Sequence, residues 1–150
     1  MEIGAGVMFK NLMNNLAVTV PVEASLLQSF IGPKIKELSD VTVAVTEGQL
    51  ILSGTKKVGV SFFAKDIRFK LTVVPKEALG RKIVFSVVNV EPTDKEMFNA
   101  MFLNHDPYIF YDARTLTLDL STMGILQKVK VGNIKSLALE EGRIILIVGA

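Results

Sequence analysis

Residues 41–54 read Val41-Thr-Val-Ala-Val-Thr-Glu-Gly-Gln-Leu-Ile-Leu-Ser-Gly54, a pattern that predicts two short strands joined by a tight turn. Apolar and polar residues alternate before the Glu47-Gly48 pair, as they do along a half-buried strand. Glycine suits the turn because a hairpin bend commonly needs a residue that tolerates positive φ. The same phrase returns as Leu137-Ala-Leu-Glu-Glu-Gly-Arg-Ile-Ile-Leu146, so we expect two matching hairpins in a β-dominated chain.

The composition narrows the classes of protein to consider. The chain has 150 residues, enough for a sizeable core, and we expect a single domain over residues 1–150. It contains no cysteine, which excludes disulfides, thiolate metal sites and cysteine nucleophiles. Its 17 basic and 15 acidic residues give a net charge of +2, too small to attract nucleic acid or an anionic membrane by bulk charge.

Apolar side chains are more abundant than in an average soluble domain. They make up 49% of the residues, and counting Gly in place of Tyr brings the share to roughly 55%, against the ~45–50% that is typical. No run reaches the ~18 apolar residues of a membrane-spanning helix, and the first residues lack the basic region of a signal peptide, so we expect a cytoplasmic protein. The surplus then serves an apolar interior, a ligand cavity or a self-association surface.

Two helices are expected from apolar residues spaced by three and four. The main one begins at Pro21, a favoured first helical position, and it either kinks or ends at Gly32-Pro33. A shorter one begins near Thr93, which is placed to cap it, and ends before Asn104. Residues 1–16 have a similar spacing and are a candidate helical arm.

Alternation with period two predicts long strands through the middle of the chain. Residues 58–74 alternate with a change of parity near Lys65-Asp66, which predicts a bulge, and residues 108–120 alternate as one strand. The basic residues beside Phe69 take the opposite parity to its ring. The run therefore predicts an apolar inner face and a charged outer face rather than a base-stacking surface for nucleic acid.

Catalytic signatures are scarce. The one histidine, His105, lies beside Asp106, which could orient it as a general base, but the sequence has neither a nucleophile elbow nor a phosphate-binding loop. A single histidine in a chain without cysteine cannot supply the usual metal cluster. We therefore expect a protein that is not an enzyme and that uses no metal or cofactor.

The elements follow one another as an amphipathic helix, the run of residues 41–54, long alternating strands, a short helix and the closing Glu140-Glu-Gly-Arg-Ile-Ile-Leu146. This order resembles the bacterial tubular lipid-binding (TULIP-like) domains over roughly residues 17–149. The resemblance implies an α+β fold in which a highly twisted antiparallel β-sheet wraps around one main amphipathic helix, plus a short second helix. In such domains the space between helix and sheet can open for acyl chains or similar ligands.

Carried onto this chain, the resemblance implies a groove that binds a lipid or other apolar small molecule. The groove would be lined by Leu27, Phe30, Ile31, Ile35, Phe62, Phe69, Leu71, Phe85 and Leu118. A ligand of this kind needs a concave, dry wall with few polar groups, which the composition can provide. One alternative is a closed core without ligand space. Another is a structural or interaction protein that self-associates as a homo-oligomer through its apolar surplus. Peripheral membrane contact would accompany lipid binding, and no nucleic acid is expected as a partner.

Overall fold

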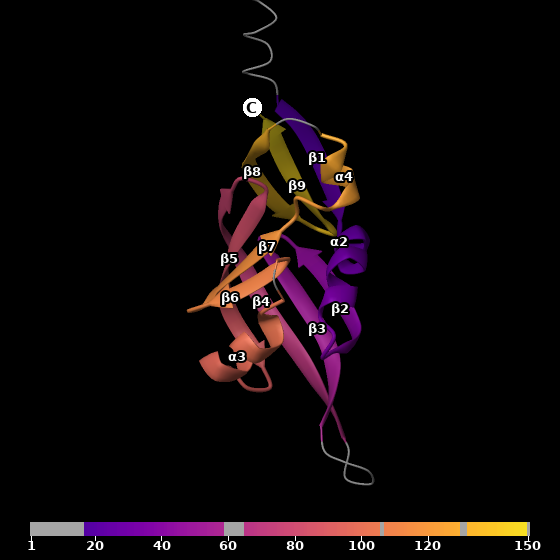
Figure 1. Cartoon of the computed structure of the whole chain (residues 1–150), viewed down its shortest axis with the longest axis vertical. Helices are drawn as coiled ribbons and strands as arrows, with labels where there is room; N and C mark the ends of the chain where they lie inside the picture. The colour runs from indigo at the N-terminus through magenta and orange to yellow at the C-terminus, as the bar shows by residue number, and fades with distance from the viewer. Residues whose placement is uncertain (1–16, 59–64, 106, 130–131, 150) are drawn as a thin grey trace, which may run out of the picture.

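The chain forms two antiparallel β-sheets with short helical segments beside them (Figure 1). The computed structural model describes residues 17–58, 65–105, 107–129 and 132–149, so the candidate arm of residues 1–16 lies outside the described residues. The strands are β1 (Ala17–Glu23), β2 (Ser39–Thr46), β3 (Gln49–Val58), β4 (Lys65–Leu79), β5 (Lys82–Glu91), β6 (Ile109–Asp112), β7 (Thr115–Asp119), β8 (Asn133–Glu140) and β9 (Arg143–Gly149). The helical segments are α2 (Ala24–Ile31), the single 3-10 turn η1 (Gly32–Lys34), α3 (Glu96–Leu103) and α4 (Gly124–Gln127).

The strands divide between a small sheet and a large one. The small sheet has the order β1-β9-β8, and the large sheet has the order β2-β3-β4-β5-β7-β6. The predicted α+β class with antiparallel strands is confirmed. The strands were expected in one sheet, but they form two. β1 pairs with β9 from the other end of the chain, and with β8 these strands make a separate sheet.

Both predicted hairpins are confirmed. β2 and β3 join at Glu47-Gly48, and β8 and β9 join at Glu141-Gly142. Gly48 has φ of 82° and Gly142 has φ of 85°, in the left-handed region that favours glycine. The repeated phrase in the sequence therefore corresponds to one local structure built twice.

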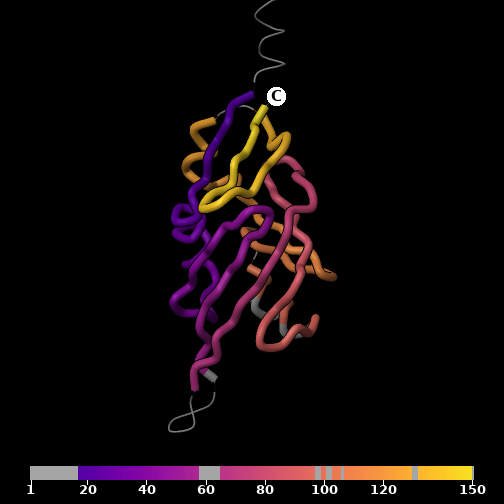
Figure 2. Tube along the Cα trace, turned by 180° about the vertical axis from the view of Figure 1, so that it is seen from behind, coloured from indigo at the N-terminus to yellow at the C-terminus, as the bar shows by residue number. Residues whose placement is uncertain are grey.

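The two hairpin tips are hydrogen-bonded to each other, and this contact joins the two sheets. The Gly48 N–H donates to the Leu139 carbonyl at 3.1 Å, and the Gly142 N–H donates to the Val45 carbonyl at 2.8 Å. These four residues occupy equivalent positions in the repeated phrase, so the contact is reciprocal, like a local two-fold interface. Figure 2 shows the yellow tip of the β8–β9 hairpin against the purple tip of the β2–β3 hairpin.

The main helix begins three residues later than predicted. Pro21 does not begin the helix, because β1 continues to Glu23 and pairs Pro21 with Ile145 of β9. β1 is an edge strand, where a missing backbone N–H is tolerated. The helix starts at Ala24, and of the two alternatives at Gly32-Pro33 the second is confirmed: the α-helix ends at Ile31 and a 3-10 turn follows.

Two reversals of the chain were not predicted. Residues 58–74 do not form one bent strand, since β3 ends at Val58 and its antiparallel neighbour β4 begins at Lys65, where the change of parity was predicted. Residues 108–120 likewise split into β6 and β7 around Ala113 and Arg114, which have φ of 47° and 66°. A turn with two non-glycine residues at positive φ lacks the usual Asn-Gly signal, so alternation alone could not locate it.

The short second helix is confirmed, but its start is later than predicted. α3 begins at Glu96 after Lys95, and the expected cap at Thr93 lies outside it. A further segment, α4, is held by Arg81 from the β4–β5 turn. The Arg81 guanidinium donates to the carbonyls of Leu126, Val129 and Gly132 at 2.7, 2.5 and 3.0 Å. The Leu126 carbonyl lies in the last turn of α4, where a helix leaves acceptors without an intrahelical partner, and the other two carbonyls follow the helix.

The backbone conformation at the hairpin tips generates a stability prediction. Gly48→Ala and Gly142→Ala should each lower the free energy of unfolding by about 1 kcal/mol, because a Cβ at positive φ is strained although no atom lies within 4 Å of it. Equilibrium urea unfolding measures the loss. Gly124→Ala, also in open space but in α4, is the control and should not be destabilised; equal midpoints for all three variants would contradict the prediction.

Candidate functional site

The structure brings most of the predicted groove residues into one apolar interior. Leu27 and Ile31 come from α2, and Ile35 directly follows η1; they join Phe69 and Leu71 of β4, Phe85 of β5 and Leu118 of β7 in a single core cluster. All seven are at most 5% exposed. Phe30 is half-buried and packs against this cluster, whereas Phe62 lies outside the described residues.

Strand alternation explains why the large sheet contributes these side chains. Phe69 is buried, and its neighbours Arg68 and Lys70 are exposed. The same alternation sends Phe85 and Leu118 inward from β5 and β7, on the face that α2 covers. The predicted apolar inner face and charged outer face of this part of the chain are therefore confirmed.

Both edge strands of the large sheet are covered by neighbouring segments, β2 by α2 and β6 by the residues that follow α3. At one edge, the amide of Gln28 in α2 accepts a 2.9 Å hydrogen bond from the Val43 N–H of β2. At the other edge, the Tyr111 N–H of β6 donates to Asn104 Oδ1 at 2.8 Å, and His105 and Ile109 form a backbone bridge. Side chains thus occupy N–H groups that an edge strand would otherwise offer to another chain.

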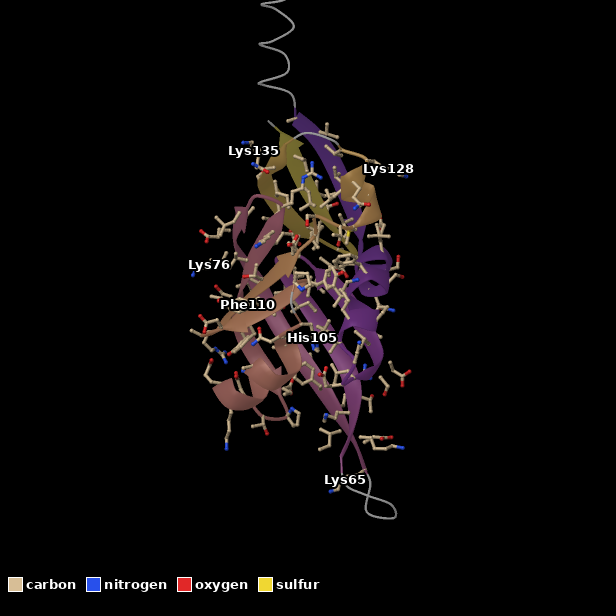
Figure 3. All side chains as sticks on the ribbon, in the orientation of Figure 1. Lys65, Lys76, His105, Phe110, Lys128 and Lys135 are labelled. Atoms are coloured by element: carbon tan, nitrogen blue, oxygen red, sulfur yellow. The ribbon has the colours of Figure 1, made fainter. Side chains whose placement is uncertain are left out.

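Five side chains join α2, η1 and the residues just after η1 to the turn before β6, and we call this set the seam: Phe30, Lys34, Glu37, His105 and Tyr108. The rings of Phe30 and Tyr108 meet edge to face, with centroids 6.1 Å apart and planes at 89°. Lys34 Nζ lies 4.0 Å from the Phe30 centroid and 4.5 Å from the Tyr108 centroid. Figure 3 shows His105 between the β6–β7 side of the molecule and the helical segment.

His105 belongs to the seam, where it contacts a carboxylate from the other side. Its Nε2 lies 3.0 Å from Glu37 Oε2, a partner that the sequence did not suggest. Asp106, the predicted orienting group, lies outside the described residues. The arrangement provides a polar contact that holds the helical segment against the turn.

A polar cluster behind β6 was also missed by sequence reasoning. Tyr111 Oη donates to Glu96 Oε1 at 2.5 Å and accepts a 3.2 Å hydrogen bond from the Asn99 amide, which also donates to Asp94. Arg114, from the strained β6–β7 turn, forms a salt bridge with Asp94. Burial and the hydrogen bond with Glu96 raise the pKa of Tyr111, so it stays a neutral donor that fixes α3 against β6.

The opposite face of the large sheet carries an apolar depression of about 280 Å³. Phe110, Thr117 and Val84 lie opposite one another on β6, β7 and β5, and directly opposed residues share a face. Leu79 and Pro107 complete the apolar wall, with Lys82 and Asp119 beside it. Leu79 is 55% exposed and Phe110 is 49% exposed. The sequence did contain one sign of this surface: Phe110 is an aromatic residue at a position of its strand where the alternation expects a polar one.

Comparisons with known proteins identify no relative of this chain. No protein-family model, curated protein or solved structure matches the chain. Among the described residues, histidine and acidic side chains do not gather in threes as a metal site would require. The helices within the described ranges are all too short or too polar to cross a bilayer.

Two phenylalanines on opposite faces of the large sheet allow a direct test of which surface is core. Phe85→Ala should lower the free energy of unfolding by about 3–5 kcal/mol, because it empties a fully buried position. The matched variant Phe110→Ala should cost less than about 1 kcal/mol, since half of that side chain is already in water. Equilibrium urea unfolding compares the two, and similar losses would contradict the assignment of the inner face.

The polar cluster generates a pH prediction. Burial acts to raise the pKa of Asp94, but hydrogen bonds from Asn99 and Arg114 and the charge of Arg114 together hold it below its usual value. A carboxyl group of this kind stabilises the fold above its unfolded pKa, and the contribution is lost as the pH falls through its folded pKa.

Asp94→Asn should therefore be less stable than wild type near neutral pH, and the difference should shrink as the pH falls below about 4. Urea unfolding at a series of pH values measures this, with Glu77→Gln, an exposed carboxylate outside the cluster, as control. A difference that stays constant with pH would contradict the role of this carboxylate.

Proposed function

We propose that this protein binds a hydrophobic or lipid-like molecule between α2 and the large sheet, and that it is not an enzyme. In this proposal the sheet wraps around α2 as in the tubular lipid-binding domains that the sequence resembles. The observation that carries the proposal is the bridging position of the α2–η1 segment, which contacts β2 through Gln28 and the β6 side through Phe30. Its apolar face covers the inward side chains of the strands between them.

A ligand would enter by parting the seam, because the predicted groove residues fill the interior of the structure. An edge-to-face aromatic pair contributes about 0.5–1.5 kcal/mol beyond its buried area, and a cation over a ring about 0.5–2 kcal/mol. Burying an alkyl chain returns roughly 0.8 kcal/mol per methylene, so about five methylenes would offset even the complete loss of these contacts. The core side chains would remain covered, by ligand instead of by one another.

A second candidate function rests on the outer face. The depression around Phe110 exposes large apolar side chains that a second copy of the chain could cover. In that case the protein would be a structural or interaction protein that self-associates, and the interior would stay closed.

One experiment with matched variants separates the two functions. Native mass spectrometry gives the oligomeric state and any bound molecule, and organic extraction then identifies what is released. Phe30→Asp places a charge at the seam, and Phe110→Asp places the same charge on the outer face. For the ligand-binding function, wild type and Phe110→Asp should carry a stoichiometric apolar molecule, and folded Phe30→Asp should not.

The alternative makes the reverse prediction. A wild-type oligomer without ligand that Phe110→Asp converts to a monomer, and that Phe30→Asp leaves intact, would replace ligand binding by self-association. Equal ligand content in folded Phe30→Asp and wild type would refute the assignment of the seam as the entrance. Circular dichroism of each variant establishes that it is folded.

A further inference from the structure

We propose that the seam is a site for an alkylated ammonium group, so that the ligand is an amphiphile with an ammonium headgroup at the seam and its apolar tail inside. The inference rests on the proposed function and adds the chemical class of the headgroup. In the structure, Lys34 of the chain itself occupies this site.

The aromatic pair has the geometry of a cation site. Lys34 Nζ lies within 4.5 Å of both ring centroids, and the two rings stand at 89° to each other. A cation within about 6 Å of a ring centroid is attracted by the ring's electron-rich face, and cages of such rings recognise quaternary ammonium ligands. Phe30 and Tyr108 come from segments far apart in the sequence, so only the folded chain creates the site.

The polar groups around the rings also favour a positive charge. Lys34 Nζ donates to the Phe30 carbonyl at 2.9 Å, and this carbonyl lies in the last turn of α2, where the helix dipole is negative. The Glu37 carboxylate, which contacts His105, belongs to the same seam. An anionic headgroup placed between the rings would instead face electron-rich rings and the Phe30 carbonyl oxygen.

Lys34 is suited to exchange with a ligand. It lies on the 3-10 turn η1 and is only half-buried, and its side chain is long and flexible. Phe30 is followed directly by Ile31, and Leu27 lies one turn earlier on α2, both within the core cluster. A headgroup that replaces the Lys34 ammonium would therefore stand at the edge of the interior that receives the tail.

Amphiphiles with the same tail test the headgroup. Decyltrimethylammonium, decanol and decyl sulfate are titrated below their micelle concentrations into wild type and three variants, by calorimetry. Removing the competing ammonium in Lys34→Ala should strengthen binding of decyltrimethylammonium by about 2- to 30-fold relative to wild type. Tyr108→Leu should abolish its advantage over decanol. Lys36→Ala, which removes an exposed lysine of the same segment, is the matched control and should behave as wild type.

The outcomes separate failure of the headgroup from failure of the function. Equal affinity for the three amphiphiles would overturn the ammonium site and leave apolar binding intact. Tightest binding of decyl sulfate that depends on Lys34 would also overturn it, in favour of an anion site.

A probe without a tail tests the cation site by itself. Tetramethylammonium should shift the ring proton signals of Phe30 and Tyr108 in the NMR spectrum of Lys34→Ala. If those signals do not move, the ammonium site is refuted whatever the tail does. If they move and no decyl amphiphile binds, the cation site stands and the proposed apolar function fails.

Discussion

The rest of the structure depends on the two reciprocal hydrogen bonds between the hairpin tips. Gly48 and Gly142 each donate to the other hairpin, and the Ala24 N–H at the start of α2 donates to the Gly142 carbonyl at 2.9 Å. This junction therefore sets the point from which α2 departs, and it links the two sheets together with the 2.8 Å hydrogen bond from the Ile134 N–H of β8 to the Gly80 carbonyl of the β4–β5 turn. Because α2 is short, that point decides which residues arrive at the far edge of the large sheet, namely Phe30 and the lysine that follows on η1.

The apolar surplus is used in two places with different consequences. Most of it fills the interior, where side chains from α2 and the strands leave each other almost no exposure. A smaller share lies on the outer face around Phe110, open to water. Interior apolar groups stabilise the fold whether or not a ligand is bound, whereas exposed apolar groups are available to contact another molecule. The two proposed functions differ in which of these surfaces meets a second molecule.

Sequence reasoning was most successful where the signal was local and repeated. The Glu-Gly turns, the flanking alternation and an interruption of the main helix at Gly32-Pro33, as a kink or an end, could be predicted because glycine, proline and side-chain parity act within a few residues. It failed at Pro21, where pairing with a distant strand outweighed the preference of proline for the start of a helix. It also failed at Ala113-Arg114, where the turn contains neither glycine nor asparagine. Sequence reasoning also identified the apolar residues of the candidate groove, but it did not show that their side chains pack against one another and fill the space.

The amino-acid order was sufficient for the strand-rich class, the two hairpins and the set of side chains that turn inward, because each follows from periodicity and turn chemistry along a short stretch. The partners across the seam could not be inferred in this way. Glu37 meets His105, and Phe30 meets Tyr108, through segments that are distant in sequence. Their proximity results from the strand order, the direction of α2 and the hairpin junction acting together, and no pattern within a short stretch of sequence reports these long-range relations.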